Sequence, residues 1–430
     1  MKKFLALLTV LVLLSSSVFA VTSVTKENSQ DGYPGVLTKG SISGTSTFIA
    51  DMPLLANTVM FEYAGAIFGM AAIKTDFGIL GISVSPSALT PTVSGITANG
   101  VDTFGLQYGT ELSGMGLGAS LLIGNDSWSY KNDDIVANAA ATGSADGYDV
   151  ENYTDSYYGL KLGAALRGNM PIDVALGVTM DNSYERGKDY NNVANGVVVA
   201  DNTIDNSKLG FELSGRVGLG KDLLAVLGVV YAMGSEKATD LTYNTAGTKL
   251  TETITLLTNN YFEVDALIGK DIKATESLTI KIASGLMVNT NQDTLTKTES
   301  ILPVAPVAYS TGPRWSELVL SIPLNVAVEG KLNDTWSINA GASATLLSSD
   351  NETWKNNVAA ASNDPDPRYS RGWLDINPTL GYSVGVTGKI GDLQIDLNLN
   401  PMILINGPYL ISGQTTGTMV ADLALVYGWK

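Results

Sequence analysis

The fold of this chain is decided by a stretch near its C-terminal end, Leu393–Asn400, which reads LQIDLNLN. Its odd-numbered positions are all leucine or isoleucine, and its even-numbered positions are all Gln, Asp or Asn. Alternation with a period of two is typical of a β-strand that has one apolar and one polar face. The stretch therefore predicts a strand that lies between an apolar and a polar environment.

Fifteen further segments show this alternation or fit it between turns. They predict an all-β protein of about 16 strands, with 14 as the alternative if the first hairpin is misassigned. The segments are Asn57–Tyr63, Ile67–Ile73, Phe77–Val84, Phe104–Tyr108, Met115–Ile123, Tyr158–Leu166, Ile172–Met180, Leu209–Leu219, Leu223–Met233, Phe262–Ile268, Leu278–Val288, Leu318–Val328, Trp336–Leu346, Leu374–Val386 and Met419–Trp429.

The connections between these segments are alternately short and long. The short ones carry turn residues, and they are Gly168–Pro171, Gly220–Asp222, Gly269–Glu276, Gly330–Asp334 and Gly388–Asp392. The long ones are mostly rich in Asn, Asp, Ser and Thr, and they are Asn125–Tyr153, Asn182–Asn206, Gly234–Asn259, Asn289–Arg314, Asp350–Arg371 and Asn406–Gln414. This asymmetry predicts a transmembrane antiparallel β-barrel over residues 57–430, with short periplasmic turns and long extracellular loops.

The N-terminal residues divide into two parts. Met1–Ala20 has two lysines, an apolar run and a small-residue exit, which predicts a signal peptide that is cleaved after export. Residues 21–56 show no clear period, and we expect them to form a periplasmic extension or a plug in the barrel lumen.

Charge and composition exclude several classes of function. The formal charge of -16 becomes -18 once Lys2 and Lys3 leave with the signal peptide, which argues against nucleic acid as a partner. The chain has no Cys, so an exported protein of this size must be held by extensive backbone hydrogen bonding or by a large core rather than by disulfides.

The sequence predicts no enzyme. It contains no His, which excludes a Ser-His-Asp arrangement, a His general base and a His-ligated zinc. The close acids Asp133-Asp134 and Asp364-Pro365-Asp366 do not have the spacing of a calcium loop and are typical of solvated loops. We therefore expect no catalytic residue, no bound metal and no cofactor.

The alternation places charged residues on the polar face of the strands. If the apolar face contacts lipid, these residues line the lumen, where a charge costs little because the lumen holds water. Nine of the fourteen candidates are acidic, which predicts a mild preference for cations. They are Lys161, Arg167, Asp173, Lys208, Glu212, Arg216, Glu263, Asp265, Lys281, Glu317, Glu329, Asp375, Asp396 and Asp422.

With its leader, its alternating strands, its unequal connections and its final strand Met419–Trp429, the chain resembles the porin-like β-barrel proteins of the bacterial outer membrane. The resemblance implies contact with outer-membrane lipid and lipopolysaccharide, and insertion by the outer-membrane assembly machinery. It also implies passive diffusion of small hydrophilic solutes through a channel, and it is compatible with a homo-oligomer. The alternatives are a plugged transporter for hydrophobic compounds and a structural or adhesive surface protein.

Overall fold

The structure, a computed structural model, describes residues 37, 45, 47–63, 67–85, 102–131, 150–191, 197–220, 222–244, 248–301, 307–355, 368–375, 380–399 and 420–429. The expected signal peptide, most of residues 21–56 and the expected loop Asn406–Gln414 lie outside the described residues. Within these residues, no helix has both the length and the apolar character that a membrane-spanning helix requires.

The described chain is almost entirely β-strand, preceded by one short 3-10 helix, η3 (Ile49–Leu55). The strands are β1 (Thr58–Tyr63), β2 (Ile67–Thr75), β3 (Gly78–Ser85), β4 (Thr103–Leu112), β5 (Met115–Lys131), β6 (Val150–Leu166), β7 (Ile172–Asn191), β8 (Val197–Gly220), β9 (Leu223–Tyr243), β10 (Lys249–Lys273), β11 (Leu278–Ile301), β12 (Val307–Lys331), β13 (Trp336–Lys355), β14 (Arg368–Asp375), β15 (Leu380–Ile390), β16 (Leu393–Leu399) and β17 (Val420–Gly428).

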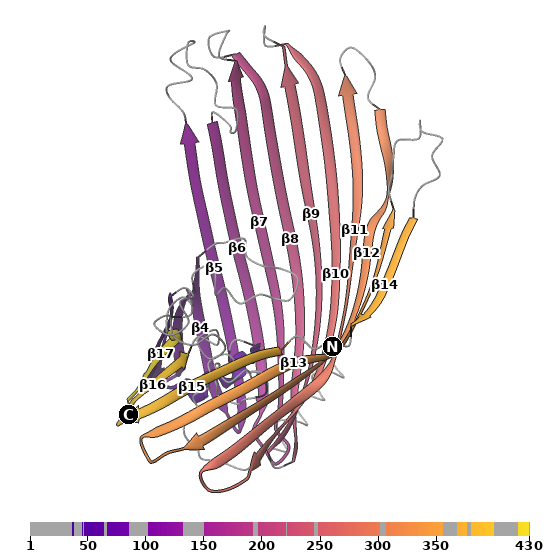
Figure 1. Ribbon diagram of the computed structural model, residues 1–430. Coiled ribbons are helices and arrows are strands. Elements are labelled where there is room, and N and C mark those ends of the chain that lie inside the picture. Colours follow the sequence, from indigo (N-terminus) through magenta and orange to yellow (C-terminus); the bar gives the residue numbers. More distant parts are fainter. Residues whose placement is uncertain are drawn as a thin grey trace, which may run out of the picture.

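The strands form one closed antiparallel barrel. Strands that follow each other in the chain pair with each other, with β14 and β15 as the exception, and β1 closes the ring by pairing with β17 from Thr58↔Gly428 to Tyr63↔Leu423. Short turns gather at one end of the barrel, and strands β5 to β12 rise far beyond the others at the opposite end (Figure 1). Closure leaves no open sheet edge, which is what a strand protein needs in order to cross a bilayer.

One strand position of the barrel is shared by two strands. The upper part of β13, from Ser348 to Lys355, pairs with β14, and its lower part, from Trp336 to Ala344, pairs with β15. The 17 strands therefore occupy 16 positions around the barrel, which confirms the predicted number. The predicted strand Leu374–Val386 spans the end of β14 and the first part of β15, which pair one after the other with β13; the residues between Asp375 and Leu380 lie outside the described residues.

The outer face of the barrel carries an apolar belt. In β7 the outward residues from Ile172 to Met180 are all apolar, and the next outward residue is Asn182; in β8 the belt runs from Leu209 to Leu219. These spans match the roughly 9–11 residues that a transmembrane strand needs. The large side chains exposed there, such as Leu176 at 50%, suit contact with lipid.

Much of what the sequence indicates as long loops is strand. β8 begins at Val197, so it carries 12 residues before the belt starts at Leu209, or about 40 Å at the usual rise per residue. The stretches Asn182–Asn206, Gly234–Asn259 and Asn289–Arg314 continue the ladders of β7 to β12 in the same way. The expectation of loops there is wrong because a strand outside the bilayer is wet on both faces, so its side chains need not alternate between apolar and polar although its backbone still pairs.

Candidate functional site

A short segment of chain lies inside the barrel, near the end that carries the short turns. We call residues 48–55 the lumen segment; they comprise Phe48 and the helix η3, and most of their side chains are fully buried. The inner wall makes room for them with glycines. A Cβ added at Gly118 would lie 2.2 Å from the carbonyl oxygen of Ile49, and one added at Gly163 would lie 3.0 Å from the amide nitrogen of Ala50. The wall of β5 and β6 is therefore shaped for close approach of this backbone.

A buried ion cluster fixes the lumen segment to the wall. Asp51 Oδ1 lies 2.7 Å from Arg167 Nη1, and Asp51 Oδ2 accepts a hydrogen bond from Arg216 Nη2. Arg216 Nε donates to Asp173 Oδ2 at 2.7 Å, and Arg167 Nη2 donates to the carbonyl oxygen of Ala50 at 2.8 Å. Because Asp173 and Arg216 face each other in the β7–β8 register, the wall part of the cluster is set by strand pairing. Two positive and two negative charges compensate each other, as buried charges must.

Apolar contacts extend the attachment around the lumen. The ring of Phe48 lies under Arg216, with the guanidinium carbon 4.4 Å from the ring centroid, which is cation–π geometry. Phe48 also belongs to a buried cluster that includes Val226 of β9 and Ala327 of β12. The lumen segment is thus held by strands on more than one side of the barrel.

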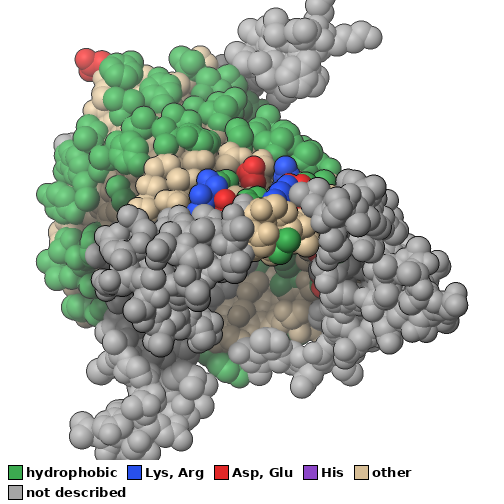
Figure 2. Space-filling model, turned by 90° about the horizontal axis from the view of Figure 1, so that it is seen from above, with side chains coloured by type: hydrophobic (Ala, Val, Ile, Leu, Met, Phe, Trp, Pro, Cys, Tyr) green, Lys and Arg blue, Asp and Glu red, His purple; other side chains and the backbone are tan. Residues whose placement is uncertain are grey.

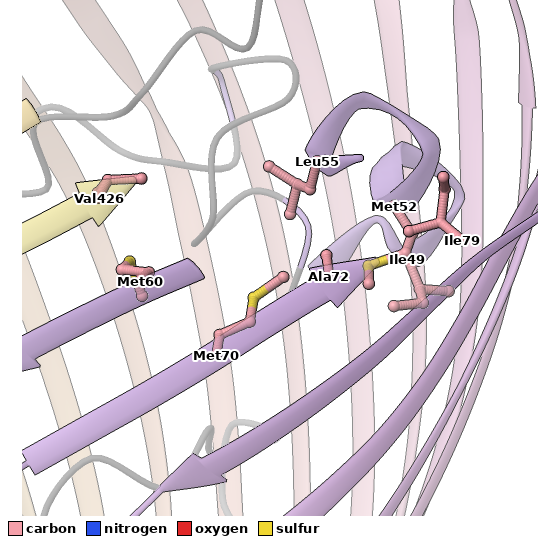
Figure 3. Packing of buried hydrophobic residues seen from close by; sticks show 8 residues of the cluster. All are labelled: Ile49, Met52, Leu55, Met60, Met70, Ala72, Ile79 and Val426. Atoms are coloured by element: carbon pink, nitrogen blue, oxygen red, sulfur yellow. The ribbon is translucent and has the colours of Figure 1, made fainter. Parts of the chain in front are cut away.

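The helix η3 itself packs toward the opposite part of the wall. Ile49, Met52 and Leu55 join a second buried cluster with side chains of β1, β2, β3 and β17, as Figure 3 shows. The wall members of this cluster are Met60, Met70, Ala72, Ile79 and Val426. The lumen is therefore lined by apolar side chains on this side, at the level of the segment.

Charged and amide side chains line the wall beyond the segment. Seen from above, side chains of both charges lie on the inside and apolar side chains gather on the outside (Figure 2). Lys161 Nζ pairs with Glu212 Oε2 at 3.0 Å, and Lys208 Nζ lies 3.9 Å from Asp181 Oδ2. On β10, the hydroxyl of Tyr261 donates to Glu263.

A cavity of about 390 Å³, lined by both polar and apolar side chains, opens on the inner face of β8 to β11. Asn259 Nδ2 donates to Asn291 Oδ1 and to Asp293 Oδ1, both at 2.6 Å, so these side chains form a ladder across β10 and β11. Lys208 and Tyr261 also line the cavity. The lining thus combines amide groups with charges of both signs, from Lys208, Glu236 and Asp293.

The structure places the predicted lumen residues as follows. Arg167, Asp173 and Arg216 meet in the ion cluster, and Lys161 and Glu212 meet in a separate pair. Six others lie on the strand face that points into the barrel or contact a residue of that face: Lys208, Glu263, Asp265, Lys281, Glu317 and Glu329. Asp396 is also inward and buried on β16. The side chains of Asp375 and Asp422 lie outside the described residues, and a role of any of these residues in conduction stays a prediction.

Four buried acids, Asp51, Asp155, Asp181 and Asp201, were missed by sequence reasoning. Asp51 lies in a segment without period, so no alternation marks it. Asp155 and Asp181 lie on the inner face of β6 and β7, just beyond the apolar belt, between the predicted strands and the predicted loops. Their spacing of two residues from Tyr157 and Thr179 continues the strand alternation and is a signal that could have identified them.

No protein-family model matches the chain, and no curated protein matches its sequence. Among solved structures it is similar to the ferric yersiniabactin uptake receptor FyuA of Yersinia pestis, at 9% identity and a TM-score of 0.36 over 80% of this chain and 67% of that one. It is similar to the siderophore receptor PiuA of Acinetobacter baumannii, at 9% identity and a TM-score of 0.39 over 76% of this chain and 55% of that one. It is also similar to the toluene transporter TodX of Pseudomonas putida, at 11% identity and a TM-score of 0.36 over 94% of this chain and 97% of that one.

The chain spans about half the length of PiuA, and scores of this size carry no argument about what the chain transports. The class is decided by the structure itself. A closed antiparallel barrel of 16 strand positions, with an apolar outer belt and short turns at one end, is the architecture of bacterial outer-membrane barrels. This confirms the class that the sequence resembles.

Proposed function

We propose that the chain is a channel of the bacterial outer membrane for small hydrophilic solutes, with a mild preference for cations and with a lumen that its own residues 48–55 close. The observation that carries the proposal is the position of the lumen segment, which fills space between opposite parts of the wall near the short turns. The apolar belt supports a place in lipid. The amide-lined cavity and the inward acids Glu263 and Asp265 support a hydrated, cation-preferring path.

The proposal requires that the lumen segment leave the wall for conduction. Buried ion pairs suit a reversible attachment, because water and solute can solvate the separated charges once the lumen is wet. The apolar clusters alone would make the segment a permanent part of the wall. On this view the barrel rests closed and opens when the contacts of Asp51 and Phe48 are released.

Single-channel recording in a planar bilayer tests the proposal. The refolded chain without residues 1–20 is compared with a variant in which residues 48–55 are replaced by a Gly/Ser linker of equal length. The variant should give long-lived open steps and, under a salt gradient, a reversal potential of cationic sign, whereas the parent opens rarely. A variant that is correctly folded but silent would refute the channel.

A second candidate, a transporter for apolar compounds, is favoured by one observation. The wall beside η3 is lined by Met60, Met70 and Ile79, so a solute that passes the segment on this side meets apolar side chains. Cells that produce the linker variant discriminate the two. Increased sensitivity to a small hydrophilic antibiotic alone supports the hydrophilic channel, and increased sensitivity to an apolar antibiotic alone supports the second candidate.

A further inference from the structure

The carboxylate of Asp51 occupies a position that two arginines of the wall define. Arg167 lies directly after β6 and Arg216 lies on β8, and each faces a different oxygen of the carboxylate. Guanidinium groups bind carboxylates through such paired, charge-assisted contacts. The acceptor belongs to the lumen segment, whereas both donors belong to the barrel.

The charges do not balance once the lumen segment leaves. The wall then keeps Arg167, Arg216 and Asp173, whose formal charges sum to +1, because only Asp51 has moved. Asp173 still accepts from Arg216 Nε at 2.7 Å and from Arg167 Nη1 at 3.4 Å, so these contacts are unchanged. The Nη groups that faced Asp51 lose that acceptor, and their position favours another anion of the same shape.

We propose that Arg167 and Arg216 form a carboxylate-binding site, which Asp51 occupies in the closed barrel and which a carboxylate-bearing solute takes when the segment leaves. The solute thereby competes with the segment that blocks it and stabilises the open barrel. The inference rests on the proposed function in one respect, namely that the lumen segment can leave the wall. It adds the chemical class of the solute that opens the channel.

The surroundings of the site restrict the solute further. The ring of Phe48, three residues before Asp51, lies against the guanidinium of Arg216, so the segment presents a ring and a carboxylate together. Leu224 and Leu267 pack against the buried cluster that contains Phe48, which makes the surroundings of this ring apolar. The solute that best replaces these contacts is a monocarboxylate with a small aromatic or apolar body. A second negative charge would be disfavoured by the inward acids of β8 and β10.

Cysteine labelling tests the inference directly, because the chain has no native Cys. Met52→Cys places a reporter on the lumen segment, where the native side chain is fully buried. Met170→Cys is the matched control, since Met170 is 59% exposed at a short turn. The rate of reaction with a hydrophilic maleimide is measured in sodium benzoate and in sodium chloride of equal ionic strength.

We expect benzoate to raise the labelling rate of Met52→Cys several-fold over chloride, and to leave that of Met170→Cys unchanged. Adding Arg167→Gln and Arg216→Gln should abolish the difference between the salts. Equal rates in benzoate and chloride, in a barrel that conducts, would overturn the carboxylate site and leave the channel standing. A reporter that is never labelled, in a barrel that never conducts, would overturn the channel as well.

A second measurement does not depend on movement of the segment. Asp51→Ala empties the position between the arginines and should lower the temperature at which the lumen contacts unfold, followed by near-ultraviolet circular dichroism. Sodium acetate, whose carboxylate fits the vacated position, should raise this unfolding temperature part of the way back, whereas sodium chloride at equal ionic strength should not. Restoration by chloride to the same extent, or by neither salt, would overturn the site.

Discussion

Replacing Gly118 with alanine should loosen the lumen segment without changing any charge. The added Cβ would lie 2.2 Å from Ile49 O and 2.4 Å from Ile49 C, where ordinary contact begins near 3.4 Å. The backbone of the segment must therefore retreat by roughly 1.2 Å, the difference between 3.4 and 2.2 Å. Overpacking of this kind costs about 1–3 kcal/mol. If that cost falls on the closed state, the ratio of open to closed barrels rises by about 5- to 160-fold.

The assay is the open probability of single channels in a planar bilayer, with heat-modifiable migration in gels as the check on folding. Gly69→Ala is the matched control, because no atom lies within 4 Å of its added Cβ. Gly163→Ala should be intermediate, since its Cβ would meet Ala50 N at 3.0 Å. The expected order of open probability is Gly69→Ala equal to the parent, then Gly163→Ala, then Gly118→Ala. A folded Gly118→Ala protein with the open probability of the parent would refute the reasoning.

Three further predictions concern other parts of the molecule. Beyond the belt, Arg186 donates two hydrogen bonds to Asp201, 2.8 and 2.6 Å long, and these hold the pKa of Asp201 below its usual value. The stability that this pair contributes is present above about pH 4 and is lost as the pH falls through the lowered pKa. The rate of proteolysis in this part of the wall should therefore increase as the pH is lowered. The Asp201→Asn variant should already be cleaved at neutral pH and should show no further increase in acid. An equal increase in the parent and the variant would contradict the prediction. Glu263→Gln combined with Asp265→Asn should move the reversal potential under a salt gradient toward zero, and an unchanged potential would remove these acids from the path. Asp222 has a φ of 61°, so Asp222→Gly should raise the free energy of unfolding by about 0.5–1 kcal/mol, read from the urea midpoint, with Asp222→Ala lowering it.

Alternation predicts the strands wherever one face contacts lipid. The stretch Leu393–Asn400 corresponds to β16, Leu393–Leu399, almost residue for residue. The same reasoning fails for the upper part of β8, from Ala200 to Lys208, where odd and even positions are both mostly polar because water contacts both faces. The apolar–polar alternation thus marks the part of a strand that crosses the bilayer, and the backbone pairing of the strand continues beyond it.

Only those residues of the candidate site that lie on the barrel wall could be predicted from the sequence. Asp173 and Arg216 follow from strand parity, because their outward neighbours are apolar. Asp51 could not be predicted, since a 3-10 helix of seven residues inside a lumen imposes no period on its sequence. Its partnership with Arg216 joins positions 165 residues apart, and only the closed barrel brings them together.

Asp51 has an electrical consequence as well. It is the only charged residue between positions 47 and 57, so an applied voltage acts on this stretch through a single negative charge. Moving one charge across a whole membrane at 100 mV involves about 2.3 kcal/mol, and the segment would cross only part of that distance. Voltage should therefore shift the occupancy of the open channel by less than about fifty-fold per 100 mV, in a direction that reverses with polarity. Asp51→Asn should make the two polarities alike.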